Sequence, residues 1–132
     1  IIYALSNDLL IKDLADTATP ILSARQAEYV ACDHEDNLWI LYSNKNLCKI
    51  DAYGSVIWDV SLTSDAFVPN GNAQARIVNF IAELDINTKA FKHYGLILDG
   101  KTQNVLKVDP ANGNVINTLK TTPTFNITNP FF

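Results

Sequence analysis

Methionine is absent from the sequence, even at the first position, and the 132 residues include only two cysteines and five glycines. Without an initiator methionine, we expect the chain to be a processed product or a piece of a longer polypeptide. The longest apolar runs, such as 39–42 and 95–98, span about four or five residues, whereas a bilayer-spanning helix needs about 20. The first residues show no basic start followed by an apolar segment, so no signal peptide is recognised. We therefore expect no membrane insertion.

Positive charge is scarce and scattered. The net charge is −4, the pI is about 4.9, and the ten lysines and arginines form no basic run. Proteins that bind nucleic acid without regard to sequence, or that bind anionic lipid, rely on clustered Lys and Arg. The composition therefore disfavours nucleic acid and anionic membrane surfaces as partners, while the 48% hydrophobic fraction is enough for a packed domain core.

The two cysteines, Cys32 and Cys48, form no CxxC motif and have no His or Cys cluster nearby, so they do not indicate a zinc site. We expect two buried free thiols. A disulfide is the alternative in an oxidising compartment, but the strand assignment below places the two residues on non-adjacent strands, which disfavours a bridge.

Apolar and polar residues mostly alternate or cluster in short runs, and helical spacing is hard to find, which predicts an all-β protein. Turns rich in Asn, Asp and Gly separate the runs, as tight hairpin connections require. The candidate strands are 1–6, 9–12, 20–23, 28–32, 38–43, 47–51, 55–62, 76–85, 90–98, 104–109 and 114–120.

A strand-turn-strand unit repeats along the chain. The sequence KIDAYGSVI at 49–57 matches KVDPANGNVI at 107–116, and a fainter copy at 3–12 aligns Lys12 with Lys49. The unequal spacing of the copies indicates an insertion of about twenty residues, which we expect mostly within 64–92. A period near 40 made of four short antiparallel strands is typical of a β-propeller blade.

We therefore predict an incomplete β-propeller of four-stranded antiparallel blades, with 1–132 as a single segment. A ring takes at least four blades, so the remaining blades must come from a longer chain or from another subunit. The predicted divisions are a partial blade at 1–27, a blade at 28–63, an inserted loop at 64–75, a blade at 76–121, and a tail or start of a next blade at 122–132.

Three motifs resemble those of known propeller families. DHEDNLWI at 33–40 resembles the D-x-x-G-N-L-W-V run of NHL-like, streptogramin-lyase-like and gluconolactonase-like propellers, with Asp36 at the usual Gly position. The run at 107–115 looks like the K-V-D-P-x-T-G-x-V run of YVTN-type and quinoprotein-like propellers. Gly54 and Trp58 are similar to the Gly-x-x-x-Trp of quinoprotein-like blades, which implies that Trp58 packs between blades. Asn117 occupies the Trp position in the later copy.

The acidic turn at 33–36 offers three carboxylates and an imidazole, a set that could bind a divalent cation. The spacing is not that of an EF-hand, and residues in a tight hairpin turn are expected to project into solvent. We favour a solvated turn and predict no metal site.

The remaining polar candidates give no catalytic constellation. Strand alternation places His93 and Gly95 on one face and Lys92 and Tyr94 on the other, so His93 is expected to be a packed or edge residue. No nucleophile elbow, phosphate loop or dinucleotide-binding glycine motif occurs. The sequence thus predicts no catalytic residue and no cofactor.

Aromatic residues concentrate in the second blade, where core packing is the favoured interpretation and a ligand platform the alternative. The aromatic residues concerned are Trp39, Trp58, Tyr29, Tyr42 and Tyr53. Apolar residues in the inserted loop and at the C-terminus are the best candidates for contacts with a partner, because long loops on β scaffolds commonly carry binding surfaces. These candidates are Phe67, Val68, Pro69, Phe131 and Phe132.

The predicted function is that of a non-catalytic binding or structural propeller module within a larger protein or assembly, and an extracellular or virion setting is favoured. Its expected partners are other protein chains or the remainder of its own polypeptide. The alternatives are part of a propeller enzyme, such as a lyase, lactonase or quinoprotein-like dehydrogenase completed by other blades, and a sensor of small molecules or glycans.

Overall fold

Eleven short strands and the turns between them make up the part of the chain that the computed structural model describes, residues 2–21, 25–42, 46–62, 75–99 and 104–119. This part contains no helix, and hence none that could cross a bilayer. The strands are β1 (Tyr3–Leu5), β2 (Ile11–Asp13), β3 (Asp16–Pro20), β4 (Ala27–Cys32), β5 (Leu38–Tyr42), β6 (Asn46–Ile50), β7 (Val56–Ser61), β8 (Arg76–Asp85), β9 (Ala90–Leu98), β10 (Val105–Val108) and β11 (Val115–Leu119).

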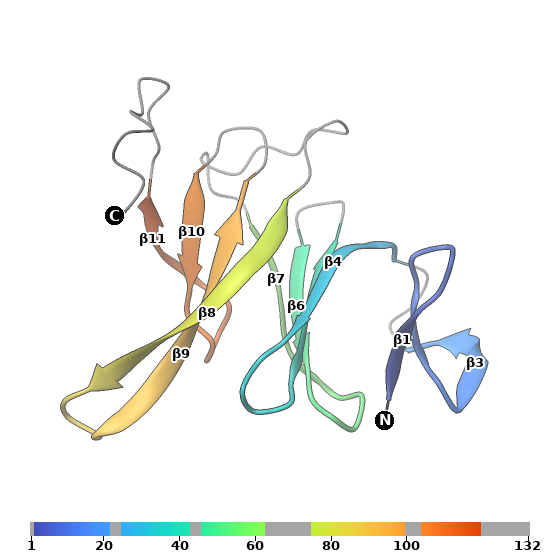
Figure 1. The fold of residues 1–132 in the computed structure, drawn as a ribbon, viewed down its shortest axis with the longest axis horizontal. Helices are drawn as coiled ribbons and strands as arrows, with labels where there is room; N and C mark the ends of the chain where they lie inside the picture. The colour runs from blue at the N-terminus through green and yellow to red at the C-terminus, as the bar shows by residue number, and fades with distance from the viewer. Residues whose placement is uncertain (1, 22–24, 43–45, 63–74, 100–103, 120–132) are drawn as a thin grey trace.

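The strands form three antiparallel sheets in chain order. The first sheet has the order β1-β2-β3, the second β4-β5-β6-β7, and the third β11-β10-β9-β8. Figure 1 shows these sheets side by side, with the N-terminal sheet at one end of the row and the third sheet at the other. Within each sheet every strand pairs with the next along the chain, so each sheet is a meander, as in a propeller blade. The all-β, incomplete-propeller prediction is confirmed in this architecture.

The predicted strand at 20–23 was misplaced in the part that the structure describes. The strand observed there is β3, Asp16–Pro20, which pairs with β2 across a turn at Leu14 and Ala15, and Ile21 follows its end; positions 22 and 23 lie outside the described residues. The turn contains no Gly, Asn or Pro, and it is stabilised where the Asp13 carboxylate accepts the Ala15 N–H at 3.0 Å. The β-branched residues of the DTATP sequence were the available signal for a strand here.

The second sheet is buried on both faces. Side chains along β5 and β6 point alternately to one face and the other, and each face packs against a neighbouring sheet. One face packs against the first sheet, where Ile11 of β2 contacts a cluster of buried side chains of the second sheet. That cluster consists of Ala27, Leu38, Ile40, Tyr42, Cys48 and Ile50. The other face packs against the third sheet, with Trp39, Leu41, Leu47 and Trp58 meeting Ile77, Ile97, Leu106 and Val108. A strand buried on both faces reads as a continuous apolar run, which explains the LWILY sequence of β5.

The repeat found in the sequence has a structural counterpart. Lys49 lies on β6 and Lys107 on β10, each the third strand of its sheet, and the following turns contain Gly54 at φ 88° and Gly113 at φ 79°. Only glycine adopts this left-handed region readily, so the spacing of these glycines sets the hairpins. The first copy is shifted relative to the predicted alignment, because Ile11, and not Lys12, packs toward the next sheet.

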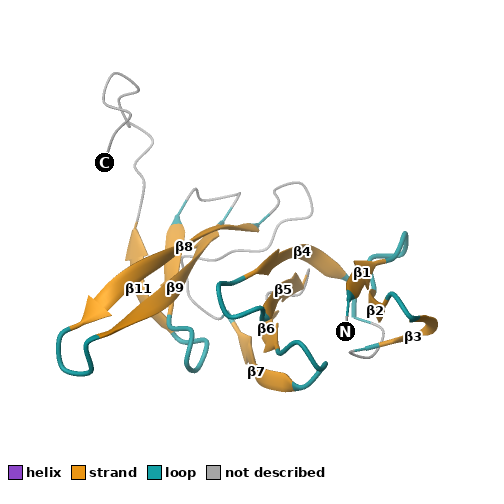
Figure 2. Ribbon diagram, turned by 60° about the horizontal axis from the view of Figure 1, so that its bottom comes forward, coloured by secondary structure: helices purple, strands orange, loops and turns teal. Residues whose placement is uncertain are grey.

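The third sheet differs from the second in the length of its first hairpin. β8 and β9 have ten and nine residues, whereas β4 and β5 have six and five. β10 pairs only with the Gly95–Leu98 end of β9, so the other end of the β8–β9 hairpin projects beyond the sheet (Figure 2). Part of the predicted insertion is therefore a β-ribbon.

Candidate binding cleft between the second and third sheets

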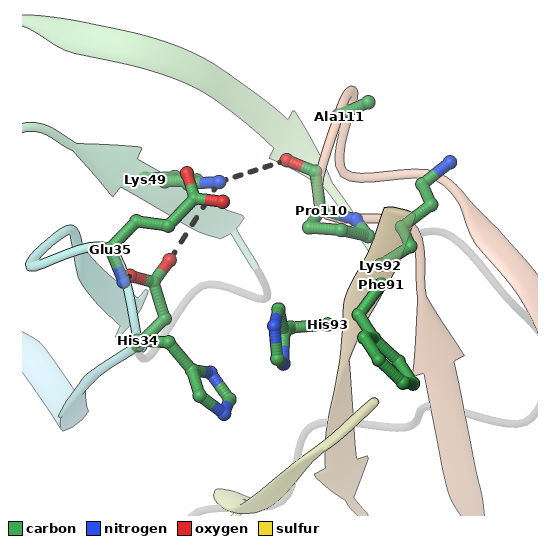
Figure 3. Close-up of a pocket in the computed structure, with 9 residues that line it drawn as sticks. His34, Glu35, Lys49, Phe91, Lys92, His93, Pro110 and Ala111 are labelled. Carbon is green, nitrogen blue, oxygen red and sulfur yellow. Dashed lines mark hydrogen bonds and ion pairs between the residues drawn. The ribbon is translucent and has the colours of Figure 1, made fainter. Parts of the chain in front are cut away.

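A cleft of about 220 Å³ opens where the β4–β5 turn of the second sheet meets β9 and the β10–β11 turn of the third (Figure 3). It combines acidic, basic and imidazole side chains from segments far apart in the sequence. Its lining residues are Asp33, His34, Glu35, Lys49, Phe91, Lys92, His93, Pro110 and Ala111.

Asp33 organises the second-sheet side of the cleft. Its Oδ1 accepts the backbone N–H groups of Glu35 and Asn37 at 2.9 and 3.0 Å, and its Oδ2 accepts the Trp39 indole N–H at 2.9 Å. The carboxylate is only 6% exposed, so the prediction that the whole acidic turn projects into solvent was wrong for this residue. A carboxylate with several N–H donors is satisfied without a metal ion. Asp36 adopts φ 61°, a left-handed conformation that glycine adopts readily and aspartate tolerates.

Lys49 joins the two sheets. Its Nζ lies 3.7 Å from Asp33 Oδ2 and donates a hydrogen bond to the Pro110 carbonyl oxygen at 3.0 Å (Figure 3). The same carbonyl accepts the indole N–H of Trp58 at 2.9 Å. The Lys49 side chain is 8% exposed, so its charge is compensated by the carboxylate and the carbonyl rather than by water. These bonds fix the β10–β11 turn against the second sheet.

The chain's two histidines meet across the same junction. The ring centroids of His34 and His93 lie 3.6 Å apart with an interplanar angle of 36°. His93 shares its face of β9 with Gly95, whose backbone lies against the Trp39 ring, so the predicted alternation along this strand is confirmed. His93 is therefore a packed residue at the sheet–sheet contact.

On the third-sheet side, Lys92 forms an ion pair with Asp109 at 2.9 Å. The hydrogen bond to Asp109 raises the pKa of Lys92. Burial works to raise the pKa of Asp109, but the hydrogen bonds from Lys92 and from the Ala111 N–H outweigh it and leave that pKa lowered. Both groups are charged at neutral pH, and each is neutralised by the other.

The chemistry of the cleft is consequently that of a joint between sheets. Lys49 and Lys92 each face a carboxylate, and Asp33 is held by three N–H donors as well. No group of three or more His, Cys, Asp or Glu side chains in the described residues could hold a metal ion. The unused polar capacity belongs to the imidazoles and Glu35, which could orient a small polar molecule.

The aromatic residues that the sequence places in the core differ in burial. Trp39, Trp58 and Tyr42 are buried as predicted, whereas Tyr29 and Tyr53 are exposed, which the core assignment did not foresee. The predicted contact residues Phe67, Val68, Pro69, Phe131 and Phe132 lie outside the described residues. The pairing of His34 with His93 was missed, because no local pattern links a turn to a strand of another sheet.

The cysteine prediction was half right. Both thiols are free, and they lie on β4 and β6 with β5 between them, as expected. Cys48 is buried in the second sheet, but Cys32, at the end of the edge strand β4, is exposed. An edge strand has no neighbour on one side to cover its final residues.

The outer face of the third sheet, which points away from the second, is a further candidate surface. Leu96, Leu98, Val105 and Leu119 follow one another across β9, β10 and β11 by register. In the part of the chain that the structure describes, Leu96, Leu98 and Val105 are partly buried and Leu119 is 59% exposed. On the same face Lys107 lies 4.4 Å above the Tyr94 ring and pairs with Glu83.

No protein-family model matches the chain, and no curated protein matches it. Among solved structures, it is similar to the crystal structure of BamB from Moraxella catarrhalis, with 17% sequence identity and a TM-score of 0.50. The likeness covers 75% of this chain and 26% of that one, so the chain spans about a quarter of the length of BamB. At this identity the likeness concerns the fold alone. The chain has the fold of an incomplete β-propeller.

Proposed function

We propose that this chain is a non-catalytic structural or binding segment of a β-propeller, and that the outer face of its third sheet contacts a further blade. One observation carries the proposal. In the strand register, Lys49 on β6 lies opposite Trp39 on β5 and Trp58 on β7. Lys107 on β10 lies in the same way opposite Leu96 on β9 and Asn117 on β11. The outer face of the third sheet is thus equivalent to the face of the second sheet that the third sheet covers.

The pairing of charges in the cleft supports a structural role over a catalytic one. General acid–base catalysis needs a group that can reach a substrate and exchange a proton near the working pH. The charged groups Asp33, Lys49, Lys92 and Asp109 are instead engaged with one another or with backbone groups.

We further propose that the repeats are of the NHL, YVTN or quinoprotein-like kind and that the blades extend over 28–63 and 76–121. The motifs in the sequence support both assignments.

Hydroxyl-radical footprinting tests the proposal. The isolated 132-residue chain is compared with the protein purified from its natural source, and oxidation is measured at Tyr94, Leu96 and Leu98 by mass spectrometry. We expect these residues to be oxidised several-fold more slowly in the natural material, because a further blade covers them. Tyr53, 85% exposed at a turn, serves as the internal control. Equal oxidation in both samples would show that no blade covers this face.

A further inference from the structure

The projecting end of the β8–β9 hairpin carries apolar side chains into solvent. Leu84 and Phe91 are direct cross-strand partners, 53% and 63% exposed, and Ile86 in the connecting turn is 78% exposed. Alternation along β9 puts Phe91 on the face of His93, so these side chains continue the packed face of the third sheet past the end of the second. We refer to Leu84, Ile86 and Phe91 as the hairpin tip.

Most of the charges around the hairpin tip have a partner within the molecule. Glu83 pairs with Lys107, and Lys92 pairs with Asp109. Asp85 accepts the backbone N–H of Asn87 at 2.9 Å. Lys89 in the turn forms no ion pair among the described residues. A surface that matches the tip is therefore apolar and carries a carboxylate at its rim.

The chain itself contains such a surface. A groove of about 680 Å³ runs along the contact between the first and second sheets and is lined mainly by apolar side chains. Among its lining residues are Leu5, Ile11 and Leu38, together with the exposed Cys32 and Asp36. The space is sufficient for several aliphatic or aromatic side chains, and Asp36 supplies a carboxylate.

The tip and the groove lie at the same end of the molecule. Figure 1 shows the β8–β9 turn, the β4–β5 turn and the β6–β7 turn all at the lower end of the sheets, with the hairpin and the first sheet on opposite sides of the second. Two copies that meet through this end about a two-fold axis can each present a tip to the groove of the other. Such an exchange closes on itself, so it gives a dimer and not a filament.

We propose that the hairpin tip docks into the groove between the first and second sheets of a second copy of this chain, forming a reciprocal dimer. Burial of Ile86, the most exposed residue of the tip, supplies the apolar contact, and Lys89 of one copy faces Asp36 of the other. The contact shares Phe91 with the rim of the inter-sheet cleft but uses no residue of the outer face of the third sheet, on which the proposed function rests, so the two proposals can fail independently.

Analytical ultracentrifugation over a wide concentration range gives the first test. We expect the mass of the wild-type chain to rise from 14.6 kDa toward twice that value. Ile86→Glu should remain monomeric at every concentration, whereas Ile57→Glu, a matched change at a 45% exposed position on β7, should dimerise as the wild type does. A wild-type chain that is monomeric throughout, or a dimer unaffected by Ile86→Glu, overturns the proposal; the second result would assign self-association to another surface.

A thiol cross-link gives the second test. Cys32 lines the groove, so an Ile86→Cys chain should form an intermolecular disulfide between position 86 and Cys32 under mild oxidation, identified by peptide mass spectrometry. The same link should be absent after Cys32→Ser. Ile57→Cys serves as the matched control and should cross-link at least tenfold more slowly. Equal cross-linking of the two cysteine variants, or a link that does not involve Cys32, overturns the docking geometry.

Discussion

The second and third sheets are copies of one repeat, yet they stabilise the same positions by different means. Lys49 of the second sheet lies between two tryptophans and is held by Asp33 and the Pro110 carbonyl. Lys107 of the third lies between Leu96 and Asn117, over the Tyr94 ring, with the half-exposed Glu83 as its ion partner. The lysine is conserved between the copies, but its surroundings change from a dry junction to a partly solvated face.

The difference shows that a blade residue takes its energetic role from the sheet stacked upon it. Trp39 and Trp58 meet at 5.0 Å with an interplanar angle of 87° because the third sheet closes over them. Its close approach is possible because Gly95 has no side chain where the Trp39 ring lies. The third sheet has smaller residues at these two places, so a blade that covers it must supply more of the interface volume.

Exchanging the residues at the Trp58 and Asn117 positions should give the largest effect. Trp58→Asn removes a buried ring and its hydrogen bond to Pro110, so we expect a loss of about 3–5 kcal/mol in the free energy of unfolding. Asn117→Trp on the exposed strand should change it by less than about 0.5 kcal/mol. Urea unfolding monitored by circular dichroism measures both. Similar losses for the two variants would contradict the inequivalence of the two sheets.

Replacing Lys49 should also cost more free energy of unfolding than replacing Lys107, but the difference should be smaller than for the Trp58 and Asn117 variants. Lys49→Met leaves the buried Asp33 carboxylate without its cation, and we expect a loss of about 3 kcal/mol in the free energy of unfolding, at the low end of the usual range because the N–H donors to Asp33 remain. Lys107→Met breaks a partly exposed pair and should cost no more than about 1 kcal/mol. The same urea series applies, and the interpretation fails if the Lys107 variant is the less stable of the two.

A methyl group at Gly95 should cost about 1–3 kcal/mol, because a Cβ there would lie 2.5 Å from Trp39 Cζ3. Trp39→Leu introduces the residue that the third sheet has at the equivalent position. In that background the cost of Gly95→Ala should fall below about 1 kcal/mol, which a double-mutant cycle measures. An unchanged cost in the two backgrounds would mean that the ring is not what Gly95 accommodates.

The smallest expected effect concerns reactivity and not stability: the thiols of Cys32 and Cys48 should react with Ellman's reagent at different rates in the folded protein. Burial raises the pKa of Cys48 to about 11, with a further contribution from Asp59, so at pH 8 about one thiol in a thousand is ionised even before access is considered. Cys32 is exposed. Ellman's reagent at pH 8 should therefore titrate one thiol rapidly and the second only after unfolding. Loss of the fast phase in Cys32→Ser is the control, and rapid titration of both thiols would contradict the buried position of Cys48.

Much of the architecture was predictable because it is local. Alternation and the Asn, Asp and Gly turns located ten of the eleven strands, and the match of 49–57 with 107–116 predicted equivalent hairpins. The strand that was missed, β3, follows a turn at Leu14 and Ala15 that has none of the usual turn residues. In that turn a hydrogen bond from the Ala15 N–H to the Asp13 carboxylate stabilises the backbone in place of the intrinsic turn preference of glycine or asparagine.

Strand order, the repeat and the burial of Trp39 and Trp58 could be predicted from the amino-acid sequence, since these features depend on side-chain periodicity and turn chemistry within about ten residues. The inward orientation of Asp33, the contact of His34 with His93 and the projection of the hairpin tip past the sheet became visible in the three-dimensional structure alone. Each of these depends on where one sheet ends against another. Such contacts join residues that are distant in the chain, and no local pattern encodes their distance.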